Sequence, residues 1–152
     1  MTNTTSPYRF LPLSEVDAAR LRRQGGPVYV VDEKPGFPCR RCLRDAEVGD
    51  EMILVSHDPF DVTSPYRSAS PIFLHRFECS PVEPGDDTPD QLTCRQLSVR
   101  SFDDQGMMID AAVIDGIDLP GTAERLFEDP DSVALHVHNV PRGCWATTLV
   151  RV

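Results

Sequence analysis

Short runs of β-branched, aliphatic and aromatic residues, separated by turn residues, dominate the chain from residue 28 onward. Runs of this length and composition are typical of β-strands. Seven are found, at residues 28–31, 52–55, 72–77, 97–102, 107–114, 134–140 and 144–150. The short turns between them favour antiparallel pairing, and the turn Val140–Cys144 predicts a hairpin at the C-terminus.

Two segments have a helical pattern instead. Ser14 opens the first, because Asp17 three residues later supplies a weak form of capping box, and Gly25–Gly26 ends it. The second runs from Gly121 to Glu128 and is stopped by Pro130. The predicted class is therefore α+β: a β-rich, mainly antiparallel sheet with two short helices and a C-terminal hairpin.

The length of 152 residues suits one domain that spans the whole chain, residues 1–152. Residues 1–12 combine two prolines with Thr and Ser, which predicts an extended lead-in. Residues 80–90 hold three prolines, a glycine and four acidic residues, and this composition predicts an exposed loop.

Charge and composition narrow the classes of partner and compartment. A net charge of −9 repels phosphate backbones, so nucleic acid is not expected as a partner. We expect no membrane span, because no apolar run approaches the length required, and no secretory signal at the N-terminus. Five cysteines, an odd number, favour a reducing compartment, and a soluble cytoplasmic protein is the prediction.

The strongest local signal for chemistry is the pair His136 and His138. Alternate residues of a strand point to the same face, with Cβ atoms about 6–7 Å apart, so both imidazoles can bind one metal ion. The same pattern also fits two histidines on a polar strand face without a metal.

The neighbours of this pair depend on the register of the hairpin. If Val140 pairs with Cys144, the histidines share a face with small residues, Cys144, Ala146 and Thr148, which leaves space beside the imidazoles. A loop longer by one residue exchanges the faces and brings Trp145 and Thr147 instead. The sequence is compatible with both.

Cys39 and Cys42 form a Cys-x-x-Cys motif. A zinc ribbon requires a second paired knuckle, and Cys79 and Cys94 are too far apart in the chain to form one, so this interpretation is disfavoured. A thioredoxin-like pair is disfavoured as well, because only a short segment follows Cys42 before Gly49. Cys39 is then either a single reactive thiolate beside arginines or a small apolar residue of the core.

Three further residues stand out. Arg67, in the loop before the strand at residue 72, suits a bidentate clamp on a carboxylate or phosphate, or else an ordinary surface ion pair. His57 suits a third metal ligand in addition to His136 and His138, a catalytic base, or a solvated loop residue. Asp110 interrupts an apolar run, so it lies either on a wet face or buried with a partner.

Several blocks of the chain together resemble, in order and spacing, a bacterial family of uncharacterised proteins known as domain of unknown function 1203. The blocks are Asp32–Arg40, Asp45–Glu51, Ser64–Ser68, Gly106–Asp110, Leu126–Phe127 with Asp129–Pro130, and His136–Asn139 with Arg142–Cys144. The resemblance extends from about Val28 to the C-terminus and implies no established activity. Cys42 departs from the family pattern, which leaves Cys39 as the thiol of interest.

The leading hypothesis is a small-molecule enzyme with a zinc or iron ion on His136 and His138, near Cys39 and Cys144, catalysing hydrolysis or oxidation. An anionic substrate is expected. The other candidate residues are Cys39, Cys144 and Asp110 for catalysis, and Arg40, Tyr66, Arg67, Asn139 and Arg142 for substrate binding. The alternative is a noncatalytic module that binds a small anionic ligand or a partner peptide.

Overall fold

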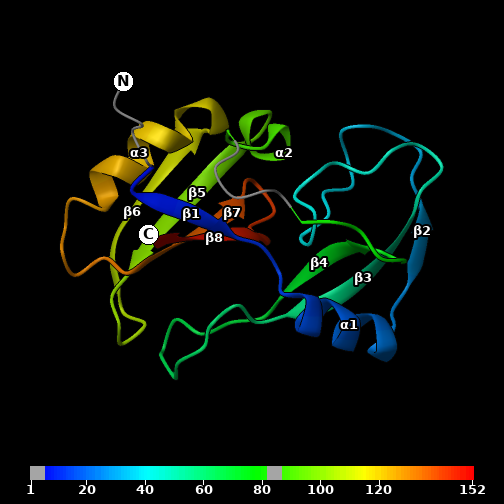
Figure 1. The fold of residues 1–152 in the computed structure, drawn as a ribbon, viewed down its shortest axis with the longest axis horizontal. Helices are drawn as coiled ribbons and strands as arrows, with labels where there is room; N and C mark the ends of the chain where they lie inside the picture. The colour runs from blue at the N-terminus through cyan, green and yellow to red at the C-terminus, as the bar shows by residue number, and fades with distance from the viewer. Residues whose placement is uncertain (1–5, 82–86) are drawn as a thin grey trace.

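The computed structural model describes residues 6–81 and 87–152, and these residues form two antiparallel sheets with short helices around them (Figure 1). The predicted β-rich α+β class is confirmed. The seven predicted strands are all present, with ends that differ by a few residues.

The larger sheet has five strands in the order β1-β8-β7-β5-β6. Its strands are β1 (Tyr8–Leu11), β5 (Gln96–Phe102), β6 (Met108–Asp115), β7 (Ala134–Asn139) and β8 (Trp145–Arg151). Strand β1 comes from the expected lead-in, of which residues 1–5 lie outside the described part. The apolar face packs on α3 (Leu119–Leu126) in a core that includes Leu97, Val99, Leu119, Ala123, Leu126, Leu135, Val137 and Leu149.

The smaller sheet has the order β2-β3-β4, formed by Val28–Val30, Glu51–His57 and Ser70–His75. Helix α1 (Glu15–Gln24) belongs to the same core, and the Oγ of Ser14 caps it by accepting a hydrogen bond from the N–H of Asp17 at 3.1 Å. The predicted cap is therefore present.

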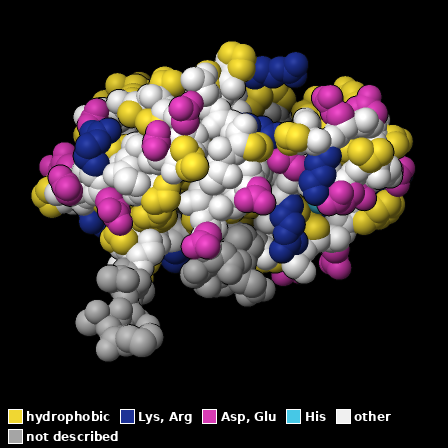
Figure 2. Space-filling model, turned by 90° about the horizontal axis from the view of Figure 1, so that it is seen from above, with side chains coloured by type: hydrophobic (Ala, Val, Ile, Leu, Met, Phe, Trp, Pro, Cys, Tyr) yellow, Lys and Arg dark blue, Asp and Glu magenta, His cyan; other side chains and the backbone are white. Residues whose placement is uncertain are grey.

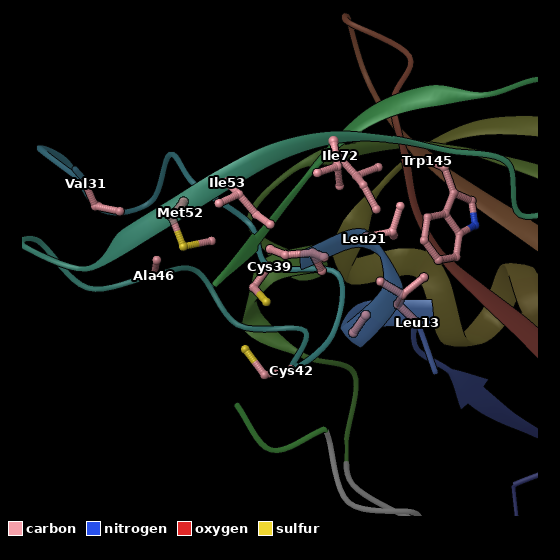
Figure 3. Close-up of a cluster of buried hydrophobic side chains, with 13 residues drawn as sticks. Leu13, Leu21, Val31, Cys39, Cys42, Ala46, Met52, Ile53, Ile72 and Trp145 are labelled. Carbon is pink, nitrogen blue, oxygen red and sulfur yellow. The ribbon is translucent and has the colours of Figure 1, made fainter. Parts of the chain in front are cut away.

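Trp145 connects the two sheets. It begins β8 of the larger sheet, yet its ring is buried in the core of the smaller sheet, near Ile72, Leu13 and Leu21 (Figure 3). Its backbone N–H donates to the Oγ of Ser70 at 3.1 Å. The start of the C-terminal strand thus contributes to both halves of the molecule.

The C-terminal hairpin has a register that neither expectation described. His136 faces Thr148, but His138 faces Trp145, because a β-bulge at Ala146 shifts the pairing. The shorter-loop register therefore holds at one end of the pair, and the tryptophan lies beside the other histidine.

Helix α2 (Asp90–Thr93) was not predicted, and it begins at the last residue of the expected loop 80–90, of which residues 82–86 lie outside the described part. Gly116, in a 3-10 turn (Gly116–Asp118), lies against this helix and donates its N–H to the carbonyl of Arg95 at 2.8 Å. A Cβ atom at residue 116 would lie 1.8 Å from the carbonyl oxygen of Leu92. Glycine is therefore required here.

We expect Gly116→Ala to lower the free energy of unfolding by about 2–4 kcal/mol, because the backbone of α2 must move to admit a methyl group. The matched control is Gly121→Ala on α3, where a Cβ meets no atom within 4 Å. That substitution should be neutral or stabilising by up to about 1 kcal/mol. Denaturant unfolding of both variants tests this, and equal effects would contradict it.

Candidate metal centre

Four side chains, Cys39, Cys42, His75 and Cys79, form a group that can hold a metal ion. Their ligand atoms all lie within 4.8 Å of one another. The first two come from the turn after β2, the histidine ends β4, and Cys79 follows four residues later. Figure 3 shows the sulfur atoms of Cys39 and Cys42 at the border of the smaller sheet's core.

The spacing of the donor atoms fits tetrahedral coordination. The Sγ atoms of Cys39 and Cys79 are 3.7 Å apart, and the Sγ of Cys42 is 3.7 Å from Nδ1 of His75. With bonds of about 2.3 Å to sulfur and about 2.0–2.1 Å to nitrogen, a tetrahedral zinc ion places two sulfurs about 3.8 Å apart and a sulfur and a nitrogen about 3.5–3.6 Å apart. Three thiolates and one imidazole are a common zinc ligand set.

Backbone contacts shape the turn that carries the first two cysteines. The N–H of Cys39 donates to the carbonyl of Arg44 at 3.0 Å, and the N–H of Leu43 donates to the carbonyl of Cys39 at 3.1 Å. Leu43 has a φ of 56°, in the left-handed region that a leucine rarely adopts. A bridge between Cys39 and Phe73 places the turn beside β4. The chain therefore reverses immediately after Cys42 and brings both thiols toward His75.

A second layer of contacts orients the ligands. Nε2 of His75 lies 3.2 Å from a carboxylate oxygen of Asp50, which leaves Nδ1 facing the thiols. Carboxylates in this position commonly orient and polarise metal-binding histidines. The N–H of His75 also donates to the Sγ of Cys39 at 3.5 Å, and the guanidinium of Arg22 donates to the Sγ of Cys79 at 3.6 Å.

The ionisable groups of this cluster influence each other strongly. The pKa of Cys39 is lowered, first by its hydrogen bond with Cys42, and the same hydrogen bond raises the pKa of Cys42. Hydrogen bonds to Cys39, and then to Cys79, raise the pKa of His75 to about 10. Because metal ligands must be deprotonated, a bound ion would replace the protons held in this group.

The residues around Cys39 attach this turn to distant elements. Arg40 is 3% exposed, and it donates from Nε to the carbonyl of Trp145 at 2.8 Å and from a terminal nitrogen to that of Pro38 at 2.6 Å. Burial lowers the pKa of Arg40 to about 10, so it stays charged at neutral pH. Gln91 of α2 donates to the carbonyl of Cys39 at 3.0 Å. Arg40 thus lies inside the fold, and its expected role in substrate binding stays a prediction.

His136 and His138 lie apart from this group, buried on the polar face of the larger sheet. The ring of His136 packs against Phe60 and Phe102, with centroid distances of 4.7 and 4.8 Å. Nδ1 of His138 lies 2.8 Å from the carbonyl of Gly143. Within residues 6–81 and 87–152, no His, Cys, Asp or Glu joins the pair in a group of three ligand atoms. The expected meeting of Cys39 with these histidines is therefore not found, since Cys39 contacts His75 instead.

The remaining predicted residues divide between the surface and the hairpin. Tyr66 and Arg67 lie in the loop before β4, where Tyr66 packs on Phe102 at 5.9 Å and Arg67 pairs with Asp58 at 2.5 Å. The ion-pair alternative for Arg67 is thus the arrangement observed. At the hairpin, Asn139 and Cys144 are half-buried and Arg142 is exposed.

Asp110 is exposed on the edge strand β6, 3.7 Å from Arg125. Asp110 therefore lies on a solvent-exposed face of the sheet and is not buried with a partner. Ion pairs of this kind are frequent on the surface, and Figure 2 shows basic and acidic side chains interspersed over the face that it displays. On that face Lys and Arg side chains lie beside Asp and Glu side chains.

Sequence analysis missed three of the four candidate ligands: Cys42, His75 and Cys79. The second pair was sought between Cys79 and Cys94, whereas its members are His75 and Cys79, separated by three residues. A His-x-x-x-Cys spacing was the signal that could have revealed them. The Cys-x-x-Cys motif, disfavoured above as half of a zinc ribbon, therefore belongs to a group that can hold a metal ion.

The fold and this group define a β-rich α+β protein with a Cys3His cluster suited to a metal ion. Residues 36–151 match the family model described as "Protein of unknown function (DUF1203)", and the chain belongs to this family. The matched region contains all four ligands but not Arg22. No curated protein and no solved structure matches the chain. The described residues contain no helix that is long and apolar enough to cross a membrane.

The buried histidines of β7 should make stability depend on pH. Burial lowers the pKa of His136 and of His138 to about 4, with each histidine also close to the charge of Arg100. In the unfolded chain the same histidines have a pKa near 6.5. Their contribution to the free energy of unfolding is therefore fully present above pH 6.5 and is lost as the pH falls from 6.5 toward 4.

The test is His136→Phe, which keeps an aromatic ring against Phe60 and Phe102. When the pH falls from 7.5 to 5, we expect the free energy of unfolding of this variant to decrease by about 2 kcal/mol less than that of the wild type. Denaturant unfolding at both pH values measures this difference. Protonation of the metal ligands affects both proteins alike, so it cancels. Parallel losses in the two proteins would show that His136 is not buried in its neutral form.

Proposed function

We propose that Cys39, Cys42, His75 and Cys79 together bind one Zn²⁺ ion and that this ion has a structural role. The observation that carries the proposal is the pair of 3.7 Å separations, one between two sulfurs and one between sulfur and nitrogen. Both match the edges of a zinc tetrahedron. A mixed sulfur and nitrogen set favours zinc over iron, which in thiolate-rich sites is typically held by four cysteines.

The structural role follows from the number of ligands. Four protein ligands complete a tetrahedron and leave no position for water or substrate, which is the arrangement of structural zinc sites. The ion would hold the Cys39–Cys42 turn against the end of β4. Through Arg40 and Gln91 the same turn contacts Trp145 of β8 and helix α2. The metal would therefore stabilise the junction between the two sheets.

The enzyme hypothesis built on His136 and His138 remains a second, separate candidate. It is favoured by one observation: Nδ1 of His136 is buried without a hydrogen-bond partner among the described residues. Tyr66 and Arg67 lie in the loop whose Phe60 covers this imidazole, and they would meet an anionic ligand there. This candidate requires a metal ion or ligand that is lost in His136→Ala and kept when His75 is replaced.

We expect protein purified without a histidine tag to contain one zinc ion per chain, measured by elemental analysis. His75→Ala and Cys42→Ser should lose most of it, and Cys94→Ser should keep it, since Cys94 lies outside the group. Chelation should lower the midpoint of thermal unfolding by roughly 5–10 °C, because a bound ion stabilises only the folded state. A folded wild type without zinc, even after reconstitution, would refute the proposal.

The contact between Asp50 and His75 allows a second test of the proposed zinc site. We expect Asp50→Asn to weaken zinc binding by about 10–100-fold, as is usual when a carboxylate behind a metal-binding histidine is removed. The control is Glu51→Gln, the next carboxylate in the chain, which pairs with Arg76 on the surface at 3.0 Å. Competition with a chromophoric chelator measures both affinities. Equal affinities would show that Asp50 does not orient the ligand.

A further inference from the structure

We propose that Cys79 is a peroxide-sensitive thiol, and that its oxidation links it to Cys39 by a disulfide and ejects the metal ion. The release of metal rests on the proposed zinc site. The disulfide does not, because it depends only on the two cysteines and their surroundings.

Access to solvent distinguishes Cys79 within the cluster. Cys39 is fully buried and Cys42 is 2% exposed, whereas Cys79 is partly exposed. The guanidinium of Arg22 donates to its sulfur at 3.6 Å, so this sulfur lies at the side of the group that faces α1. Cys79 is therefore the sulfur of the group that an oxidant in solution reaches first.

Cys39 is placed to complete the reaction. Its Sγ lies 3.7 Å from that of Cys79, so the two sulfurs need to approach by about 1.7 Å to reach disulfide length. Cys42 also contacts Cys39, and it lies 3.7 Å from Nδ1 of His75. Solvent access selects the Cys39–Cys79 pair over the Cys39–Cys42 pair, because Cys79 is the partly exposed thiol that is oxidised first and Cys39 and Cys42 are both buried.

The chemistry requires hydrogen peroxide as the only co-reactant. The Cys79 thiolate attacks one peroxide oxygen, the O–O bond breaks, and the products are a sulfenic acid and hydroxide. The Cys39 thiolate then attacks the Cys79 sulfur, an S–S bond forms, and a second hydroxide leaves. Two sulfurs are each oxidised by one electron, peroxide is reduced, and both hydroxides take protons from solvent.

Loss of two thiolates explains the release of the ion. The disulfide leaves only Cys42 and His75 as donors, which is too few for a tight zinc site. Cys94 offers a natural comparison, because it is exposed, but its sulfur contacts Asp45, Gln91 and Arg95 and no other cysteine in the described part. Peroxide can oxidise it without forming this crosslink.

The experiment treats the zinc-loaded full chain with a small excess of hydrogen peroxide. Zinc release is followed with a chromophoric chelator, and the crosslink is located by peptide mapping under nonreducing conditions. We expect one zinc ion released per Cys39–Cys79 disulfide formed, with reductant restoring zinc binding. Cys94→Ser should behave as the wild type. Cys79→His, which keeps a fourth metal ligand but cannot form the disulfide, should release zinc roughly tenfold more slowly or less.

The outcomes separate the two proposals. A Cys39–Cys79 crosslink in protein that binds no zinc would support the reactive thiol and refute the structural zinc site. Zinc-loaded protein that crosslinks Cys39 to Cys42, or in which only Cys94 is oxidised, would overturn the inference while leaving the zinc site intact. Rapid zinc release from Cys79→His would overturn it as well.

Discussion

The buried guanidinium of Arg40 is the contact on which the arrangement of the two sheets depends. It reaches from the cysteine turn of one half to the carbonyl of Trp145 at the start of β8 in the other. A charge in this position is costly unless its donors are satisfied and an opposite charge is near. Two backbone carbonyls accept hydrogen bonds from the guanidinium, and the nearby Cys39 and Asp45 favour its charged form.

The proposed metal centre would supply a negative charge that balances the positive charge of Arg40. Three thiolates and one Zn²⁺ ion carry a net charge of −1, and Arg22 donates to the cluster while Arg40 lies between two of the ligands in sequence. The two arginines are thus countercharges for the site as much as connections to the fold. This accounts for a cationic side chain at 3% exposure beside a Cys-x-x-Cys turn.

Local patterns predicted the strands well, because each apolar run is bounded by turn residues. Helix α2 escaped detection because four residues after Pro89 have too little pattern to differ from a loop. Helix α3 starts at Leu119, two residues before its predicted start, since Pro120 suits the first turn of a helix. The bulge at Ala146 depends on how β8 packs against two cores, which no local pattern contains.

The candidate metal ligands show the same limit of local sequence patterns, here for residues that are far apart in the chain. The motif at Cys39 was visible, but its partners lie at the end of β4 and just after it, and only the pairing of β4 with β3 brings His75 beside the turn. A zinc ion joining Cys39 to Cys79 would close a loop of about forty residues, whose ordering is costly in entropy. The smaller sheet has three strands, and every residue of β2 is exposed. A sheet this small needs additional support for its stability. Helix α1 and Trp145 provide part of that support, and a structural ion at the end of β4 would provide the rest where the core meets solvent.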